Sequence, residues 1–467
     1  MSGLVELGLA EAAGLLERRE ASAVDLVEAQ LANADRWEPA IRSLAHRADD
    51  SALAAARAAD AELAAGARRG PLHGIPVTIK DLVDVAGLPM EAGSRVLAGN
   101  VAARDAHAVE RLREAGAIVL GKARTHEFAF GGFTPPARNP WDVERIPGGS
   151  SGGSGAGVAA GIGYASLCSD TAGSVRSPAS FNGCVGLKPT YGRIGRSGVV
   201  PMGWTADTLG VIARSALDVA LVLDAIAGPD PRDETSIPTP HAPSAPSLED
   251  GVAGLRIGLV ESFFAAAQAD VEAAQRRAIG LLADAGATVV EVELEPRAAI
   301  DATLPAVFQL GAAEAAAWHA DWLDARRDLY GEDVHRYIDM GRHVSAVEYL
   351  DAQRIRRLVS QAFAAAFREV DLLVTPSHTH VAPRVDEQMV VYDRGEPMHR
   401  DPAGIRCLCH VNMPGLPALS VPVGLARGLP VGLHVIGPPL AETLVLRAAR
   451  AVEARAGFLG TRPTEPA

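Results

Sequence analysis

Short runs of apolar and often β-branched residues alternate along this chain with longer stretches of helical spacing, and the alternation restricts it to few folds. The runs are Ile75–Ile79, Ala117–Leu120, Leu255–Val260, Thr288–Leu294, Asp371–Thr375 and Ala418–Val423. Each has the length and composition of a buried strand. A helix is expected over Val271–Ala285, between two of these runs, which is typical of a βαβ unit. The pattern predicts one large α/β body.

The remaining segments add helices and a loop to this body. Val24, Val27 and Leu31 share a helical face, so two or three helices packed outside the core are expected within residues 1–65. Helical spacing also dominates residues 302–370. Six prolines make 229–253 the clearest loop. No internal repeat is visible. We therefore expect a single domain over residues 1–467, with parts 66–228 and 254–467 on either side of the loop.

The charge balance and the cysteine content bear on partners and location. The chain has 44 Lys+Arg against 57 Asp+Glu, a net charge of −13, which disfavours nucleic acid or an anionic membrane as a surface-wide partner. Four cysteines are too few for a disulfide scaffold and favour a reducing compartment. The N-terminal segment lacks the basic region of a secretory signal. The uncharged run Ile146–Ser169 holds eight glycines, unlike a membrane span. The cytoplasm is the expected location.

A glycine- and serine-rich run, Gly148–Gly157, has three interpretations. G-x-S-x-G fits at Ser150 and Ser151, as in a hydrolase elbow, and a dinucleotide fingerprint fits nominally from Gly155. Both motifs need a preceding strand, and residues 138–146 do not predict one. A flexible linker stays open on composition alone.

A second serine-bearing turn, Ser169–Arg176, suggests chemistry. The small residues Ala172 and Gly173 allow successive backbone N–H groups to point into one concavity, which can hold an anion. Ser174, at the end of such a turn, is well placed for acyl transfer, because neighbouring amides can hold the oxygen that becomes negative. The same turn could instead be a helix N-cap.

Lys80 could supply the base that a serine nucleophile needs near neutral pH. It follows the apolar run Ile75–Ile79, and burial would lower its pKa because low-dielectric surroundings disfavour the ammonium form. The alternative is a partly exposed lysine that pairs with Asp81 or with a helix end.

Together these pieces resemble the amidase signature family. The matching segments are Gly74–Asp81, Gly148–Gly153 and Ser169–Ala179. Supporting segments are Gly121–Phe128, Gly186–Arg193, Gly415–Pro422 and Gly428–Leu433, so the resemblance covers roughly residues 1–455. It implies a large twisted mixed β-sheet surrounded by α-helices. In that fold, residues 66–228 form the signature core, and residues 254–467 complete the sheet and the substrate pocket.

The resemblance also implies roles for individual residues, without a metal or cofactor. It assigns a catalytic triad to the base Lys80, the bridging Ser150 (in a cis peptide) and the nucleophile Ser174. It assigns an oxyanion hole to the backbone amides of Thr171, Ala172, Gly173 and Ser174. It assigns supporting roles to Ser151, Asp170 and Arg176. Three positions depart from the family pattern: Ala172 replaces a common Gly, Cys168-Ser169 replaces Gly-Thr, and His434 replaces a common Gln.

The function that follows is hydrolysis of a carboxylic amide C–N bond through an acyl-enzyme, with release of ammonia or an amine. A small-molecule amide is the expected partner, without nucleic acid or membrane, and family habit favours a homodimer. The alternative is the glutamine-hydrolysing A subunit of a tRNA-dependent amidotransferase. In those subunits an acid lies upstream of the N-x-x-G-L-P segment, and the nearest acid before Asn412 here is Asp401. A third hypothesis is a non-catalytic or cofactor-binding protein.

Two histidine and aromatic groups remain candidates of lower weight. His378 and His380 could lie at the rim of the substrate pocket or in an exposed loop. Trp318, His319, Trp322 and Tyr330 could form a pocket wall or pack between helices.

Overall fold

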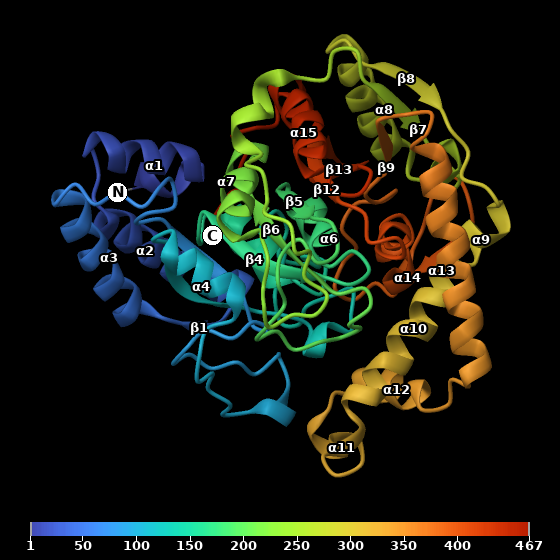
Figure 1. Cartoon of the computed structure of the whole chain (residues 1–467), viewed down its shortest axis with the longest axis horizontal. Coiled ribbons are helices and arrows are strands. Elements are labelled where there is room, and N and C mark those ends of the chain that lie inside the picture. The colour runs from blue at the N-terminus through green and yellow to red at the C-terminus, as the bar shows by residue number, and fades with distance from the viewer. Residues whose placement is uncertain (1, 466–467) are drawn as a thin grey trace.

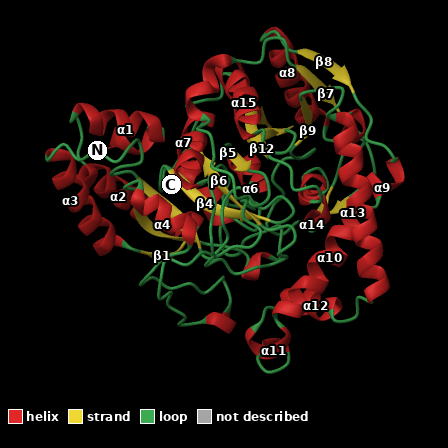
Figure 2. Ribbon diagram, in the orientation of Figure 1, coloured by secondary structure: helices red, strands yellow, loops and turns green. Residues whose placement is uncertain are grey.

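The computed structural model describes residues 2–465 and is built on a mixed sheet of 11 strands (Figures 1 and 2). Its strands, in spatial order, are β1 (Leu44–Arg47), β3 (Ile118–Ala123), β2 (Pro76–Lys80), β4 (Ala165–Asp170), β6 (Thr208–Ala213), β5 (Val185–Lys188), β12 (Ala418–Ala426), β13 (Leu429–Ile436), β9 (Leu372–Pro376), β7 (Arg256–Leu259) and β8 (Thr288–Glu291). A separate hairpin pairs β10 (Met389–Val390) with β11 (Met398–His399).

Helices surround the sheet. They are α1 (Leu9–Arg18), α2 (Ala23–Ile41), α3 (Asp49–Ala64), α4 (His107–Glu114), α5 (Gly152–Ala160), α6 (Arg176–Asn182), α7 (Ala216–Ile226), α8 (Ala269–Asp284), α9 (Arg297–Asp301), α10 (Thr303–Trp318), α11 (Ala320–Leu323), α12 (Glu332–Gly341), α13 (Ala346–Ala366), α14 (Arg400–Ile405) and α15 (Glu442–Ala456). The prediction of a large mixed sheet surrounded by helices is confirmed.

The sheet combines two parallel groups with an antiparallel centre. Strand β2 runs parallel to its neighbours β3 and β4, and β7 runs parallel to β8 and β9. The central strands β6, β5, β12 and β13 pair antiparallel. Helix α8 connects the parallel pair β7 and β8, as the βαβ pattern predicts.

The two faces of the sheet bury different helices, because successive side chains of a strand point to opposite sides. On β6, Leu209 and Val211 pack in the main core with α7 and α15. Their neighbour Ile212 packs with Cys168 of β4 and with residues of α5 and α6. The face that carries α5 and α6 therefore also carries the glycine- and serine-rich run, which leads into α5, and the turn with Ser174, which leads into α6.

Three local features of the structure were not expected from the sequence. Helix α5 begins at Gly152, so most of the glycine- and serine-rich run is helical. Strand β4 (ASLCSD) has no β-branched residue, which is why its composition did not predict a strand. The N-terminal part does not stay outside the core: Leu9 and Leu26 are buried in the main core, and β1 pairs with β3.

Helices α10 to α13 form the yellow and orange arm at the right and lower edge of Figure 1. Helix α10 packs against both α12 and α13. Among the described residues, we find no helix with the length and apolar character that crossing a bilayer requires.

Candidate active site

Lys80 lies at the carboxyl end of β2 with its side chain fully buried. Its Nζ donates hydrogen bonds to Ser150 Oγ at 2.7 Å and to Ser169 Oγ at 2.9 Å. Burial lowers the pKa of this amine from 10.5 to about 7, and the nearby Asp170 offsets only part of that effect. Near neutral pH a large fraction of Lys80 is therefore uncharged and able to accept a proton.

The position of Ser150 is fixed through its backbone. The peptide bond between Gly149 and Ser150 is cis. The Ser150 carbonyl accepts hydrogen bonds from the His126 amide and from Thr134 Oγ1, each at 3.0 Å. The single Thr134 hydroxyl proton is shared between this carbonyl and the Gly148 carbonyl, 3.1 Å away, and the Thr134 oxygen accepts from the amide of Gly152. One threonine thus holds both sides of the cis peptide.

The glycines of this run are required by packing rather than by flexibility. A Cβ on Gly149 would lie 2.6 Å from the Gly131 carbonyl oxygen, and a Cβ on Gly153 would lie 2.6 Å from the backbone nitrogen of Arg124. Such distances are too short for real Cβ contacts. The backbone of the run is thus packed against other backbone at both Gly149 and Gly153, which excludes a flexible linker. Ser151 directly precedes α5.

Ser174 lies in the short connection between β4 and α6, here called the Ser174 turn (residues 170–176). The Asp170 carboxylate accepts hydrogen bonds from the Gly173 amide at 2.8 Å and the Val175 amide at 3.1 Å. Gly173 has a φ of +131°, which favours glycine. The Gly173 amide is already bonded to Asp170, whereas the amides of Thr171, Ala172 and Ser174 are among those of this turn that have no acceptor within residues 2–465.

A buried ion pair supports the turn from behind. Arg176 Nη2 and Nε lie 2.8 and 3.0 Å from the two Asp170 oxygens, and both side chains are fully buried. Burial alone would raise the pKa of Asp170, but the charge and hydrogen bonds of Arg176 outweigh it and hold the pKa well below its usual range. Asp170 therefore stays a carboxylate and keeps its hold on the turn.

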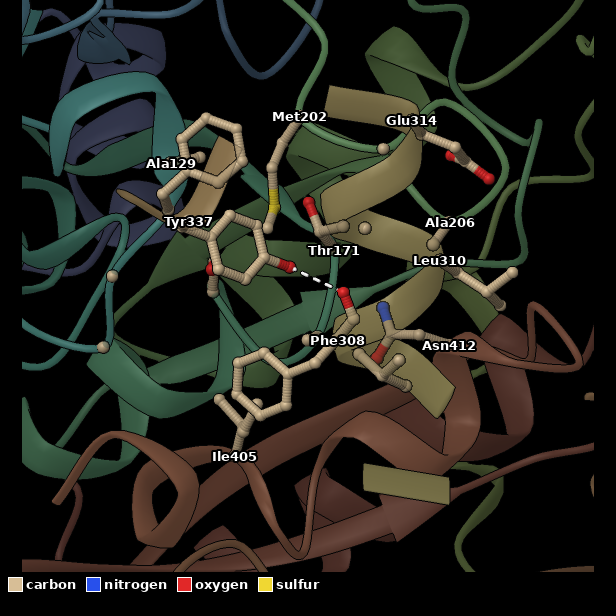
Figure 3. Close-up of a pocket in the computed structure, with 18 of the residues that line it drawn as sticks. Ala129, Thr171, Met202, Ala206, Phe308, Leu310, Glu314, Tyr337, Ile405 and Asn412 are labelled. Atoms are coloured by element: carbon tan, nitrogen blue, oxygen red, sulfur yellow. Dashed lines mark hydrogen bonds between the residues drawn. The ribbon is translucent and has the colours of Figure 1, made fainter. Parts of the chain in front are cut away.

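A pocket opens over the Ser174 turn, and its wall comes mainly from other parts of the chain (Figure 3). Thr171, Ala172 and Ser174 line its catalytic end. The apolar wall consists of Phe130, Met202, Val307, Phe308, Leu310, Ile405 and Met413. Tyr337 lies across the pocket and donates to the Phe308 carbonyl at 3.1 Å (Figure 3).

Three charged side chains also line this pocket. Glu314 is buried and accepts hydrogen bonds from the backbone and hydroxyl of Thr205. Arg356 donates through Nε and Nη2 to two backbone carbonyls, and its Nη1 has no acceptor among the described residues. Asp401 is half exposed. The pocket therefore offers both a cation and two anions to a ligand.

Some of the predicted site residues are joined by hydrogen bonds, and others lie at the same site without a bond between them. Lys80 is bonded to Ser150, and Ser151 Oγ donates to the Ser169 carbonyl at 3.2 Å. No hydrogen bond joins Ser174 to Ser150 in the part of the chain that the structure describes, although both lie at this site. Sequence reasoning missed Ser169 as a partner of Lys80, although the departure from the family's Thr at that position was a signal. Thr134 lies in a loop, and no sequence motif marked it as a residue of the site.

The other candidate residues are structural. His378 and His380 are buried, not exposed in a loop, and neither lines the pocket. The His378 ring stacks on Phe181 with centroids 3.9 Å apart. Trp318 and His319 pack edge to face against Phe128, which confirms helix packing rather than a pocket wall.

Comparisons with known proteins agree with this geometry. A family model described as Amidase matches residues 25–446. The chain is 40% identical over 482 aligned positions to the A subunit of glutamyl-tRNA(Gln) amidotransferase from Moorella thermoacetica, covering 97% of each protein. The solved structure of the A subunit of the same name from Thermotoga maritima is 31% identical, with a TM-score of 0.82 over 99% of each chain. A structure described as a vestigial protein complex that reveals the evolutionary origins of an s-triazine catabolic enzyme is 34% identical. Its TM-score is 0.92 over 98% of this chain and 100% of that chain.

These relatives correct the expectation about partners. We expected no nucleic acid and, as a protein partner, at most a second copy of this chain. That expectation is wrong, because the relatives are named as subunits of an enzyme whose name includes a tRNA. The physical reason is that a net charge of −13 describes the whole surface. It does not exclude a local contact, or an assembly in which another chain supplies the basic surface.

The family model spans most of the chain, and the relatives match it over nearly their full length. The chain therefore belongs to the amidase signature family, whose enzymes act on C–N bonds.

Proposed function

We propose that the chain hydrolyses a carboxylic amide and does so as the glutamine-hydrolysing subunit of a tRNA-dependent amidotransferase. The observation that carries the hydrolytic part is the buried Lys80 amine, 2.7 Å from Ser150 Oγ, beside a pocket lined by Ser174. A buried amine with a lowered pKa next to hydroxyl groups is the arrangement that activates a serine without a histidine.

In the first half of the reaction, the Ser174 hydroxyl attacks the amide carbonyl carbon. Its proton passes to Ser150, whose own proton passes to the neutral Lys80 amine, so Lys80 becomes an ammonium. The carbonyl oxygen becomes an oxyanion, and the unbonded amides of the Ser174 turn stabilise it. The C–N bond then breaks as Lys80 returns the proton through Ser150 to the leaving nitrogen, which departs as ammonia.

In the second half, water attacks the acyl group on Ser174. Lys80 takes a proton from that water through Ser150, and the tetrahedral intermediate forms on the same amides. Collapse of the intermediate breaks the acyl–oxygen bond, and the relay returns the proton to Ser174. Lys80 is neutral at the start and at the end, so the cycle consumes one amide and one water.

Glutamine as the substrate is supported by the charges of the pocket and by the names of the relatives. A free amino acid carries a carboxylate and an ammonium. Arg356 Nη1, which has no acceptor within residues 2–465, can donate to the carboxylate, and Glu314 and Asp401 can accept from the ammonium. Glu314 is buried, and a buried polar group that needs such a partner discriminates against amides that lack it.

A second candidate is hydrolysis of another carboxylic amide with an apolar acyl group. The specific observation in its favour is the large apolar share of the wall, which includes Phe130, Phe308 and Leu310. Binding is favoured by about 25 cal/mol of free energy for each Å² of apolar substrate surface that this wall removes from water. The two candidates share the chemistry and differ only in what binds the acyl part.

We include a cytoplasmic location and a second protein chain in the proposal. The name of the curated relatives specifies one component of a larger enzyme, and a structure at 34% identity is described as a complex. The four free cysteines, all buried, favour a reducing compartment.

The test is an ammonia assay on the protein purified from its native host together with any bound chains. L-glutamine is compared with alkyl and aryl primary amides, and a fluorophosphonate probe reports the nucleophile. Glutamine as the best substrate, with turnover raised by a copurifying chain, supports the proposal. Preference for an apolar amide supports the second candidate instead. A folded protein that releases no ammonia and is not labelled at Ser174 overturns both.

A further inference from the structure

We propose that His434 is a positioning residue for the Ser174 turn and acts on it through Arg176 and Asp170. The inference rests on the proposed function, because it assumes that this turn stabilises an oxyanion. It assigns a task to the position where the chain departs from the glutamine that is common in the family.

Arg176 is the rigid centre of this arrangement. A guanidinium has five N–H groups and no acceptor. All five are used, in bonds of 2.7–3.0 Å to both Asp170 oxygens, the Leu408 carbonyl, Asn412 Oδ1 and His434 Nε2. Because every donor has an acceptor, the plane of the guanidinium cannot turn without breaking a bond.

The His434 ring is held in one tautomer. Its Nε2 lies 3.0 Å from Arg176 Nη1, and since arginine only donates, Nε2 must carry the lone pair. Nδ1 then carries the proton and donates to Thr375 Oγ1 at 3.0 Å. Burial first, and then the charge of Arg176, hold the pKa of His434 well below its ordinary value, in agreement with a neutral ring.

The sheet itself supplies this geometry. His434 lies on β13 and Thr375 on β9, and the two are direct antiparallel partners. Partners of this kind place their side chains side by side on one face. The ring is thus anchored by the sheet at one nitrogen and holds Arg176 with the other.

The path from His434 to the turn has few steps. Arg176 fixes both oxygens of Asp170, and Asp170 fixes the amides of Gly173 and Val175 on either side of Ser174. Neither His434 nor Arg176 lines the pocket. A change at His434 should therefore alter transition-state stabilisation, seen in kcat, and leave substrate binding, seen in KM, nearly unchanged.

The test compares three variants for kcat, KM and the rate of fluorophosphonate labelling. His434→Leu removes the acceptor, and we expect kcat and labelling to fall about 100-fold, the effect of misplacing catalytic groups by about 1 Å. His434→Gln can accept from Arg176 and donate to Thr375, so it should restore both rates to within about threefold. Thr375→Val leaves His434 Nε2 as the acceptor for Arg176 but removes the hydrogen bond that anchors the ring at Nδ1. We expect about a tenfold loss in kcat.

Several outcomes would overturn the inference. One is an unchanged kcat in His434→Leu. Another is a folded His434→Gln variant that is as slow as the leucine variant. If the leucine variant does not fold, an unchanged kcat in Thr375→Val has the same meaning. Nitrogen NMR of the imidazole gives a readout independent of turnover: it should show a protonated Nδ1 and a bare Nε2, and the opposite tautomer contradicts the inference.

A matched control separates this inference from the proposed function. Ser174→Ala should abolish labelling if Ser174 is the nucleophile. If the wild-type protein is not labelled at Ser174 and releases no ammonia, the proposed function fails. If labelling depends on Ser174 but is indifferent to His434, only the role of His434 fails.

Discussion

The catalytic end of the pocket and its outer wall are built in opposite ways. At the catalytic end, Lys80, Ser150 and Asp170 are fully buried, and backbone packs directly on backbone at Gly149 and Gly153. The outer wall is made by side chains of α10, α12 and α14 together with loop residues such as Met202, and it includes Phe308, which is 37% exposed. One region tolerates almost no change in volume, and the other is adjustable. We infer that reaction type depends on the first region and substrate choice on the second.

The largest effect should come from the catalytic end. Ser174→Ala and Lys80→Met are each expected to lower kcat at least about 10⁴-fold, because the nucleophile or its base is lost. The double variant should be no slower than the worse single variant, since the residues act as one unit. Single-turnover ammonia release measures this. Losses that multiply in the double variant would mean that the two residues act independently.

The pH dependence of kcat/KM tests whether burial at the catalytic end lowers the pKa of Lys80. The Lys80 amine must be neutral to accept a proton, and its pKa is about 7. The active form is lost as pH falls, so kcat/KM should drop about tenfold per unit below that pKa and level off above it. A profile measured from about pH 5 to 9 checks this. A flat profile across neutrality would exclude Lys80 as the base.

The packing contrast can be measured directly as stability. Gly153→Ala would drive a Cβ into the backbone of Arg124, and overpacking of this kind costs about 1–3 kcal/mol of unfolding free energy. Gly280→Ala in α8 is the matched control. A Cβ there meets nothing within 4 Å, so the variant should be as stable as the parent or up to about 1 kcal/mol more stable. Urea denaturation of both variants measures their free energies of unfolding. Equal values would show that the catalytic end is not packed more tightly than the surface of α8.

The smallest effect on chemistry should come from the wall. Phe308→Ala is expected to change the preference between two amides of different acyl size by about 10-fold, through the apolar contact that it loses. The rate of fluorophosphonate labelling should stay within about twofold, because Phe308 makes no bond to the Ser174 turn. Competition between two amides measures the preference. If labelling slows as much as hydrolysis does, the two regions are not separable.

The same contrast explains what the sequence could predict. The catalytic end is made of contiguous motifs, so Lys80, Ser150 and the Ser174 turn were identifiable, and apolar runs gave strands such as β2 and β9. Strand β4 was missed because its residues have little strand preference, and tertiary burial decides its state. The bond from Lys80 to Ser169 depends on the alignment of two strands. Wall residues such as Phe308 and Tyr337 come from amphipathic helices, where no local pattern distinguishes a pocket face from a core face.

The close backbone packing around the glycine- and serine-rich run has a practical consequence for directed evolution. A mutational library spread evenly over the residues near the nucleophile would spend many of its members on destabilised proteins, since a Cβ at positions such as Gly149 and Gly153 would collide with backbone atoms. Codons for α10 and α12 are the better place for diversity. Selection for new amides should accumulate its changes there.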